Sequence, residues 1–197
     1  MFVAAATLVN DVILKIDQVT GLCDGAKFIA SPNFDEREHH QGPQAIIIHC
    51  ISLPPGEYGG DAITDLFCNV LSPKAHPYFA DIAHLKVSSH FLIRRCGDLI
   101  QYVRTTQRAW HAGESICLGK PKVNDFSIGI ELEGLDTDSE GYTDAQYNQL
   151  RQLVAALQQT YTELSPQNIF AHSDIAPGRK TDPGPYFDWT RVVSVSE

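Results

Sequence analysis

Short hydrophobic runs bounded by polar or glycine-containing turns predict β-strands at several places along the chain. Residues 45–48 are four consecutive apolar residues, which is typical of a buried strand, and His49 follows them directly. Residues 90–95 and 99–104 are two strand-like runs on either side of Cys96-Gly97-Asp98. This spacing predicts a β-hairpin, and therefore antiparallel pairing somewhere in the sheet.

A further strand is predicted over residues 128–134, where apolar residues alternate with small or acidic ones. The two-residue period of a strand places Gly129, Glu131 and Glu133 together on one face. Glu131 is then either a solvated carboxylate or a half-buried acid. Burial would raise the pKa of such an acid, which is the property wanted in a general acid or base.

Two segments show the apolar spacing of amphipathic helices. The first is residues 61–71, and the longer one begins at Thr143, where Thr143 and Gln146 match a capping box. We expect the apolar stripes of both helices to pack in the core. Their members are Ile63, Leu66, Phe67 and Val70 on the first helix, and Tyr147, Leu150, Val154, Leu157 and Tyr161 on the second.

The size of the chain indicates how many domains it forms, and its charge indicates which kinds of partner it can bind. It has 197 residues, of which 43% are hydrophobic, and this favours one domain with a substantial core. We expect residues 1–25 to form an N-terminal extension of irregular structure and residues 26–197 to form the domain. The formal net charge of -9 argues against nucleic acid or an anionic membrane surface as a partner, because a phosphate-binding protein needs a basic surface.

The cysteines and the N-terminus bear on the compartment. Five cysteines are an odd number, and they contain no CxxC pair, which disfavours a disulfide framework and is typical of a reducing compartment. Residues 1–10 are mildly apolar but have no basic residue before them, so they make a poor signal peptide. We therefore expect a cytoplasmic protein. The adjacent His39 and His40 are expected to be solvated.

Residues 172–185 contain a dense set of side chains that could do chemistry. His172, Lys180 and Asp182 lie there together with two Pro-Gly pairs. We expect this segment to be neither helix nor strand, and to present its side chains instead of burying them. If His172 and Asp182 converge, they offer a nitrogen and an oxygen to a borderline metal such as zinc, within reach of Lys180.

His49 is the candidate third ligand. An imidazole at the end of a buried strand costs free energy unless something binds it. The alternative is a core histidine whose ring is satisfied by a backbone carbonyl. With His172 and Asp182, His49 makes two histidines and one aspartate, which with one open position is the ligand count of a catalytic zinc site. Strand alternation points Cys50 to the opposite face, where we expect a small buried hydrophobe.

Six ordered motifs carry a resemblance to a known family. They are the apolar strand ending at His49 and residues 53–60, 75–79, 108–113, 124–134 and 172–185. Together they resemble the cytoplasmic 1,6-anhydro-N-acetylmuramoyl-L-alanine amidases, the AmpD family. The chain departs from the family pattern at Cys50, where Asn is often found, and at Lys86 and Lys122, where Arg is common.

The resemblance implies an α+β fold, with a single domain whose mixed central β-sheet is flanked by helices, as in peptidoglycan recognition proteins. It also implies Zn2+ bound by His49, His172 and Asp182, and catalytic roles for Glu131 and Lys180. Glu131 would take a proton from water and pass it to the leaving amine, while Lys180 would stabilise the oxyanion.

The implied substrate is a small anhydromuropeptide, cleaved between anhydro-N-acetylmuramic acid and L-alanine during cytoplasmic peptidoglycan recycling by a monomer. Trp110 is expected either to stack on a sugar ring or to be a core tryptophan with a bonded N–H. At least one of Lys86 and Lys122 is expected to pair with a carboxylate of the stem peptide, the alternative being that both lysines are solvated. His90 and His111 are interpreted as structural or substrate-side residues.

Two other functions are considered. An exported zinc amidase acting on polymeric peptidoglycan would need the same site and would differ in compartment. A non-catalytic muropeptide-binding module would lack a complete metal site, whereas this chain retains three candidate ligands.

Overall fold

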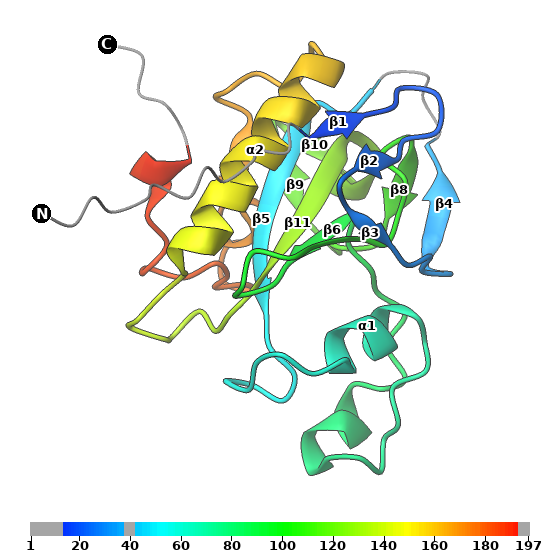
Figure 1. Cartoon of the computed structure of the whole chain (residues 1–197), viewed down its shortest axis with the longest axis vertical. Coiled ribbons are helices and arrows are strands. Elements are labelled where there is room, and N and C mark those ends of the chain that lie inside the picture. The colour runs from blue at the N-terminus through cyan, green and yellow to red at the C-terminus, as the bar shows by residue number, and fades with distance from the viewer. Residues whose placement is uncertain (1–13, 38–41, 193–197) are drawn as a thin grey trace, which may run out of the picture.

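A six-stranded mixed sheet lies at the centre of the computed structural model, which describes residues 14–37 and 42–192 (Figure 1). The strand order is β12-β5-β11-β6-β7-β3. In that order the strands are Ile169–Ala171, Ala45–Ile51, Ser127–Glu133, Phe91–Ile93, Leu99–Gln101 and Lys27–Phe28.

The strand directions divide the sheet into two parts. β12, β5, β11 and β6 run parallel to one another, whereas β7 is antiparallel to β6 and parallel to β3. The β6–β7 pair is the hairpin predicted from the sequence, and its turn contains Gly97 at a φ of 92°. Because parallel strands end at the same edge, the four strands β12, β5, β11 and β6 align their carboxyl ends.

The long helix α2 (Asp144–Thr160) covers one face of the sheet (Figure 1). Its capping box is confirmed, since the Thr143 hydroxyl accepts from the amide of Gln146 and the Gln146 side chain accepts from the amide of Thr143. The predicted stripe is packed against the sheet, with Tyr161 partly buried just after the helix end. This core also contains Ile46, Ile48, Ile128, Ile130, Leu132, Phe91 and Ile93.

A lobe formed by residues 61–87, called here the α1 lobe, lies beyond the carboxyl end of β5, in the lower part of Figure 1. It contains α1 (Ala62–Phe67) and the 3-10 helix η1 (Pro77–Asp81). The buried residues of α1 are Ile63, Leu66 and Phe67, as predicted, and they pack in a second core with Leu92 from β6.

The prediction that Val70 belongs to this core is wrong. Val70 is 66% exposed. The helix ends at Phe67, short of the predicted residue 71, and Asn69 adopts a left-handed φ of 62°. The helical spacing that would have turned Val70 inward therefore stops before it reaches this residue.

The remaining elements are short. They are β1 (Lys15–Ile16), β2 (Cys23–Asp24), β4 (Phe34–Glu36), β8 (Gln107–Ala109), β9 (Ile116–Cys117), β10 (Lys120–Pro121), η2 (Val123–Phe126), α3 (His172–Ile175) and η3 (Trp189–Arg191). β1 pairs with β2, β4 with β8 and β9 with β10, all antiparallel.

The described part of the predicted N-terminal extension joins the core. Leu14, Ile16 and Cys23 are buried in the same cluster as the α2 stripe. Residues 1–13, like the pair His39 and His40, lie outside the described residues. The division of the chain at residue 25 stays a prediction.

The fold class is confirmed: this is a single α+β domain with a mixed central sheet and few helices. Within residues 14–37 and 42–192, we find no helix with both the length and the apolar character needed to cross a bilayer.

Candidate active site

The register of the parallel strands brings three side chains of the site to one edge of the sheet. Glu131 of β11 lies directly opposite His49 of β5, on the face away from α2. Ala171 of β12 pairs with Ile48, so His172 follows one position beyond that pair. Side chains that come from the carboxyl ends of neighbouring parallel strands converge, and here they supply two imidazoles and a carboxylate.

Residues 172–185 differ in part from the prediction for this segment. His172–Ile175 form a single helical turn, α3, and His172 is buried, with 3% of its surface exposed. Asp174 stabilises this turn, because its carboxylate accepts a hydrogen bond from the amide of Ala171 at 2.9 Å. The prediction that the segment contains no helix and presents its side chains was therefore wrong for His172, whereas Lys180 is exposed.

A backbone hydrogen bond closes this segment on itself. The amide of Ser173 donates to the carbonyl oxygen of Asp182 at 3.0 Å, which holds Asp182 beside His172. The course of the backbone just after Asp182 requires glycine at position 184, since a Cβ there would lie 2.1 Å from the carbonyl oxygen of Asp136. The convergence of His172 and Asp182 that was predicted from the sequence thus has a local backbone cause.

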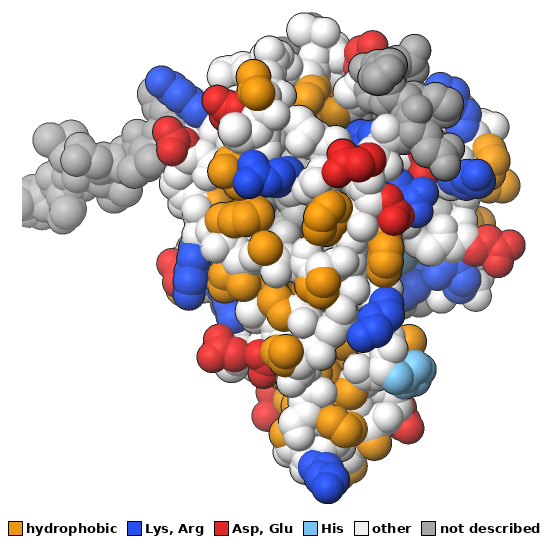
Figure 2. All heavy atoms as spheres, turned by 90° about the vertical axis from the view of Figure 1, so that its right-hand side faces the viewer, with side chains coloured by type: hydrophobic (Ala, Val, Ile, Leu, Met, Phe, Trp, Pro, Cys, Tyr) orange, Lys and Arg blue, Asp and Glu red, His pale blue; other side chains and the backbone are white. Residues whose placement is uncertain are grey.

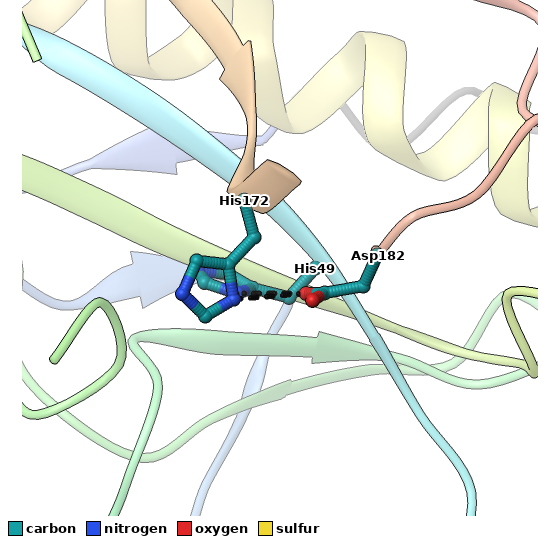
Figure 3. Close-up of side chains that lie close together, drawn as sticks. All are labelled: His49, His172 and Asp182. Atoms are coloured by element: carbon teal, nitrogen blue, oxygen red, sulfur yellow. Dashed lines mark hydrogen bonds and ion pairs between the residues drawn. The ribbon is translucent and has the colours of Figure 1, made fainter. Parts of the chain in front are cut away.

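Three ligand-type atoms meet at the centre of the site (Figure 3). The Nδ1 atoms of His49 and His172 are 2.9 Å apart, and Oδ2 of Asp182 lies 3.2 Å from the first and 3.0 Å from the second. His49 comes from β5, His172 from the start of α3 and Asp182 from the loop that precedes Pro183.

The distances between these three atoms fit a small cation in tetrahedral coordination. Zinc bound to nitrogen and oxygen at about 2.0–2.1 Å in a tetrahedron separates its ligand atoms by about 3.3 Å. Nitrogen and carboxylate oxygen are ligands that zinc takes readily. The far nitrogen of His172, Nε2, lies 3.2 Å from the carbonyl oxygen of Ala112 and donates to it, so the Nδ1 atom that faces the cluster is an acceptor.

The electrostatics of the cluster follow from its burial. Burial lowers the pKa of His49 to about 4, and the carboxylate of Asp182 opposes this shift only in part. Burial also raises the pKa of Asp182, but its contacts with the imidazoles of His172 and His49 outweigh this effect and hold that pKa well below its usual range. A neutral imidazole and an ionised carboxylate are the forms in which these side chains bind a metal.

Glu131 is a buried acid without a partner. It is 8% exposed, and its Oε2 has no hydrogen-bond partner in the described structure. Burial raises the pKa of Glu131 well above its ordinary value, the negative charge of Asp182 adds to this shift, and Lys180 opposes it. The half-buried interpretation of this residue is therefore confirmed, and the solvated one is wrong.

An open cavity of about 480 Å³ lies over these groups. Its polar floor includes His49, Glu131, His172 and Asp182, and Lys180 stands at its wall. The α1 lobe supplies an apolar wall formed by Leu66, Phe67, Tyr78, Ile82, Leu85 and Val87. The site can therefore hold an amphipathic molecule above a metal-ligand cluster and an acid.

Trp110 also lines this cavity. Its indole N–H donates to Oδ2 of Asp35 at 2.7 Å, and Arg108 binds the same carboxylate oxygen at 2.7 Å. The bonded N–H is therefore found, but the ring is half-buried at the cavity and is not part of the core. Stacking of Trp110 on a sugar ring stays a prediction.

Lys86 and Lys122 are exposed, but neither belongs to the residues that line the cavity. Lys122 precedes η2 with a left-handed φ of 58°. On the face drawn in Figure 2, Lys and Arg side chains alternate with Asp and Glu, so this face presents no continuous basic surface among the described residues.

Comparison with known proteins agrees with this arrangement. The family model described as N-acetylmuramoyl-L-alanine amidase matches residues 39–185. The chain belongs to this amidase family. The resemblance carried by the six motifs is confirmed, and a non-catalytic binding module is excluded as the class of this protein.

Individual relatives cover most of this amidase. The Escherichia coli K12 protein named 1,6-anhydro-N-acetylmuramyl-L-alanine amidase AmpD is 54% identical over 167 residues, which are 85% of this chain and 90% of that protein. The crystal structure of an AmpD selenomethionine derivative matches with a TM-score of 0.85 and 51% identity, covering 90% of this chain and 96% of that one.

A more distant solved structure holds a ligand. It is the amidase AmiD of Escherichia coli in complex with the substrate anhydro-N-acetylmuramic acid-L-Ala-D-gamma-Glu-L-Lys. This amidase matches it with a TM-score of 0.56 and 28% identity, over 81% of this chain and 64% of that one.

Two residues of the site had no specific role in the sequence analysis. His111 lies 2.9 Å from His49, measured between Nδ1 of His111 and Nε2 of His49, and Asp35 holds the Trp110 ring. His111 follows Trp110 in one of the six motifs, so its position was marked, but its contact with His49 depends on the packing of distant segments. Asp35 lies in a charged run that predicts only a surface segment.

Because one oxygen of the buried Glu131 has no hydrogen-bond partner, we predict that replacing this residue stabilises the protein. In metal-free protein, Glu131→Gln should be more stable than wild type above about pH 5, because the folded wild type must either ionise a buried carboxyl or hold a proton that the unfolded chain releases. The advantage should grow by up to about 1.4 kcal/mol per pH unit and vanish near pH 4, where both states are protonated. Urea denaturation at pH 4, 6 and 8 measures this.

Glu133→Gln is the matched control, because Glu133 lies on the same face but accepts hydrogen bonds from Arg94, Arg95 and Gly59. It should destabilise the protein. A Glu131→Gln variant that is less stable than wild type at pH 8 would contradict this account of the Glu131 side chain.

Proposed function

We propose that this amidase is zinc-dependent and hydrolyses the amide bond between 1,6-anhydro-N-acetylmuramic acid and the L-alanine of a stem peptide. The observation that carries the proposal is the cluster of His49, His172 and Asp182 beside the buried Glu131, at the floor of an open cavity. Support for the substrate comes from the AmpD relatives and from the anhydromuropeptide bound in the AmiD structure.

In this proposal His49, His172 and Asp182 hold the zinc ion. Zinc in such a site supplies Lewis-acid chemistry, which makes water more acidic and polarises a carbonyl group. The two histidines come from the sheet edge, and Asp182 is held by the Ser173 hydrogen bond, so all three ligand atoms are in position before the ion binds.

Glu131 acts as the proton carrier. Its raised pKa suits a group that takes a proton from water and then donates it to the leaving amine of L-alanine. Glu131 lines the open cavity, where its carboxyl can meet the attacking water, and no hydrogen bond holds its buried oxygen Oε2. The carboxylate of Glu133, by contrast, is paired with Arg94.

Lys180 stabilises the negative charge that develops on the scissile carbonyl oxygen. Its exposed side chain stands at the cavity wall, and it is close enough to Glu131 to oppose the rise in that residue's pKa. Because the oxyanion exists mainly near the transition state, this contact contributes to the rate more than to substrate binding.

Trp110 and the apolar wall of the α1 lobe bind the substrate away from the cleaved bond. The Asp35 hydrogen bond holds the indole in a single orientation, which suits it to stack on a sugar ring. Lys86 and Lys122 stay candidate partners for the stem-peptide carboxylates. As exposed point charges, each would contribute about 1 kcal/mol or less.

The proposed place of action is the cytoplasm, on soluble fragments of peptidoglycan. All five cysteines are free thiols in the described structure, including the exposed Cys96, which suits a reducing compartment. We propose a monomer as the active form, because one chain supplies every residue of the proposed site.

The first test of this function is the metal content. The purified protein should carry about one zinc per chain, lose activity to a chelator and regain it with Zn²⁺. His49→Ala and Asp182→Ala should lose the metal, because each removes a ligand, whereas His84→Ala, which changes an exposed histidine, should retain it. Full zinc occupancy of the His49 or Asp182 variant by elemental analysis would show that the ligand set is wrong.

The second test separates catalysis from metal binding. Glu131→Gln and Lys180→Ala should retain zinc while kcat falls by about 10²-fold or more, the usual loss for a general base or an oxyanion stabiliser. Lys74→Ala, at an exposed site outside the cavity, is the control. Wild-type kcat in a folded, zinc-loaded variant would remove that residue from the mechanism.

The third test compares substrates. Soluble anhydromuramoyl-tripeptide should be cleaved efficiently and intact cell-wall sacculi poorly, measured as peptide released per enzyme under equal conditions. Efficient release from sacculi with little turnover of the soluble fragment would favour the exported amidase. Fractionation of cells that express the full chain gives an independent answer on the compartment.

A further inference from the structure

His49 is connected through His111 to a chain of hydrogen bonds that ends in the backbone. Nε2 of His49 lies 2.9 Å from Nδ1 of His111, and Nε2 of His111 lies 3.1 Å from the hydroxyl oxygen of Ser127. That hydroxyl donates to the carbonyl oxygen of Val123 at 2.7 Å. The four groups form one path from the proposed metal cluster, through the first residue of β11, to the backbone of η2.

The chemistry of the last member determines the direction of every bond. A carbonyl oxygen only accepts, so the single hydroxyl proton of Ser127 is used on Val123. The Ser127 oxygen can then only accept from Nε2–H of His111. A neutral His111 protonated on Nε2 has a bare Nδ1, which accepts from Nε2–H of His49. Nδ1 of a neutral His49 is therefore left without a proton, and this is the atom that faces the cluster.

Two further features of the structure suit His111 to this role. In the described structure its ring contacts His49 and Ser127 and is paired with no carboxylate, so no anionic partner stabilises an imidazolium there. Its ring lies flat against β11 because residue 129 is glycine: a Cβ there would come within 2.5 Å of the ring atom Cγ.

We propose that His111 is a positioning residue that, together with Ser127, holds His49 in the tautomer protonated on Nε2, so that Nδ1 is ready to bind the metal. This inference rests on the proposed zinc function and assigns the tautomer control to residues that touch no metal. His172 needs no such relay, since its Nε2 donates directly to the carbonyl oxygen of Ala112.

The consequence is an electrostatic one. With both Nδ1 atoms bare and Asp182 ionised, three lone pairs meet within 2.9–3.2 Å with no proton between them. Such a cluster attracts a cation. The relay thus keeps the ring proton of a neutral His49 on Nε2, away from the position that the metal requires.

The tautomers can be read directly in metal-free protein at pH 7 by long-range ¹H–¹⁵N NMR of the histidine rings. We expect His49 and His111 to be neutral and protonated on Nε2 in the wild type. In Ser127→Ala, which changes no atom in contact with His49, a fraction of His49 should shift to the Nδ1-protonated form. A wild-type His49 that is protonated on Nδ1 would overturn the proposal, as would an unchanged tautomer ratio in Ser127→Ala.

Zinc affinity provides the second readout, measured by competition with a chromogenic chelator. His111→Leu, which removes the acceptor while preserving an apolar ring-sized group, should weaken zinc binding by about 10- to 100-fold, the usual effect of losing the partner of a ligand histidine. His111→Asn should bind zinc more tightly than His111→Leu, because an amide oxygen can replace Nδ1 as the acceptor for His49.

These two variants separate positioning from packing. If the Leu and Asn variants lose the same amount of zinc affinity, only the shape of the His111 side chain matters. If the Leu variant binds zinc as tightly as wild type, the His111 imidazole does not affect zinc binding. Either result overturns the proposal. Because the tautomers are measured without metal, they decide this inference even if the protein proves to use no zinc. Failure of the zinc function would instead appear as absence of zinc binding by the wild type.

Discussion

The parallel pairing of β5 with β11 is the interaction on which the rest of the site depends. Its register sets Glu131 opposite His49, and it does so with seven consecutive residue pairs, from Ser127 and Ala45 to Glu133 and Ile51. A shift of one residue would turn every side chain of one strand to the other face. It would move Glu131 into the core beneath α2 and bring a leucine or an isoleucine beside His49. The apolar residues that fill the α2 face therefore also align the acid with the proposed ligand.

This arrangement places two glutamates in different environments on one strand face. Glu133 is buried at 2% exposure but accepts hydrogen bonds from Arg94 and from two backbone amides. Glu131 is two residues away, and one of its oxygens has no partner. The first carboxylate stabilises the link between the sheet and the loop before α1, since its partner Gly59 lies in that loop. The second is destabilising for the fold and useful for proton transfer, which is the usual relation between a strained site and its scaffold.

The sequence predicted those parts of the structure that are determined locally. The apolar run before His49, the hairpin around Gly97 and the capping box at Thr143 each have a pattern that lies within one element, and each is confirmed. Val70 was predicted wrongly because helical spacing does not indicate where a short helix ends. The turn at His172 was missed because its stabilisation by Asp174 is available to many loops that do not form a helix.

The contacts within the site could not be predicted from hydrophobic periodicity and motif spacing alone. The pairing of His172 with Asp182 was foreseen from the composition of one loop, and the proposed roles of Glu131 and Lys180 came from the resemblance to a family. The contact of His111 with His49 joins residues 62 apart in sequence, and it exists only because Gly129 leaves room for the ring. No periodicity or motif spacing encodes such a meeting, since it depends on the packing of β11 against the segment that follows β8.

The ligands of the cluster differ in how rigidly the backbone holds them. His49 lies within a strand paired on both sides, and His172 begins immediately after another strand. Asp182 belongs to a loop, but the Ser173 amide binds its carbonyl oxygen and the close approach of Gly184 to Asp136 restricts the chain just beyond it. A loop ligand with these two constraints loses little conformational entropy when an ion binds. Lys180 lies two residues before Asp182 and is exposed, and its backbone amide donates to the carbonyl oxygen of Ala176. The constraints that hold Asp182 act on the backbone and therefore do not fix the position of the Lys180 side chain.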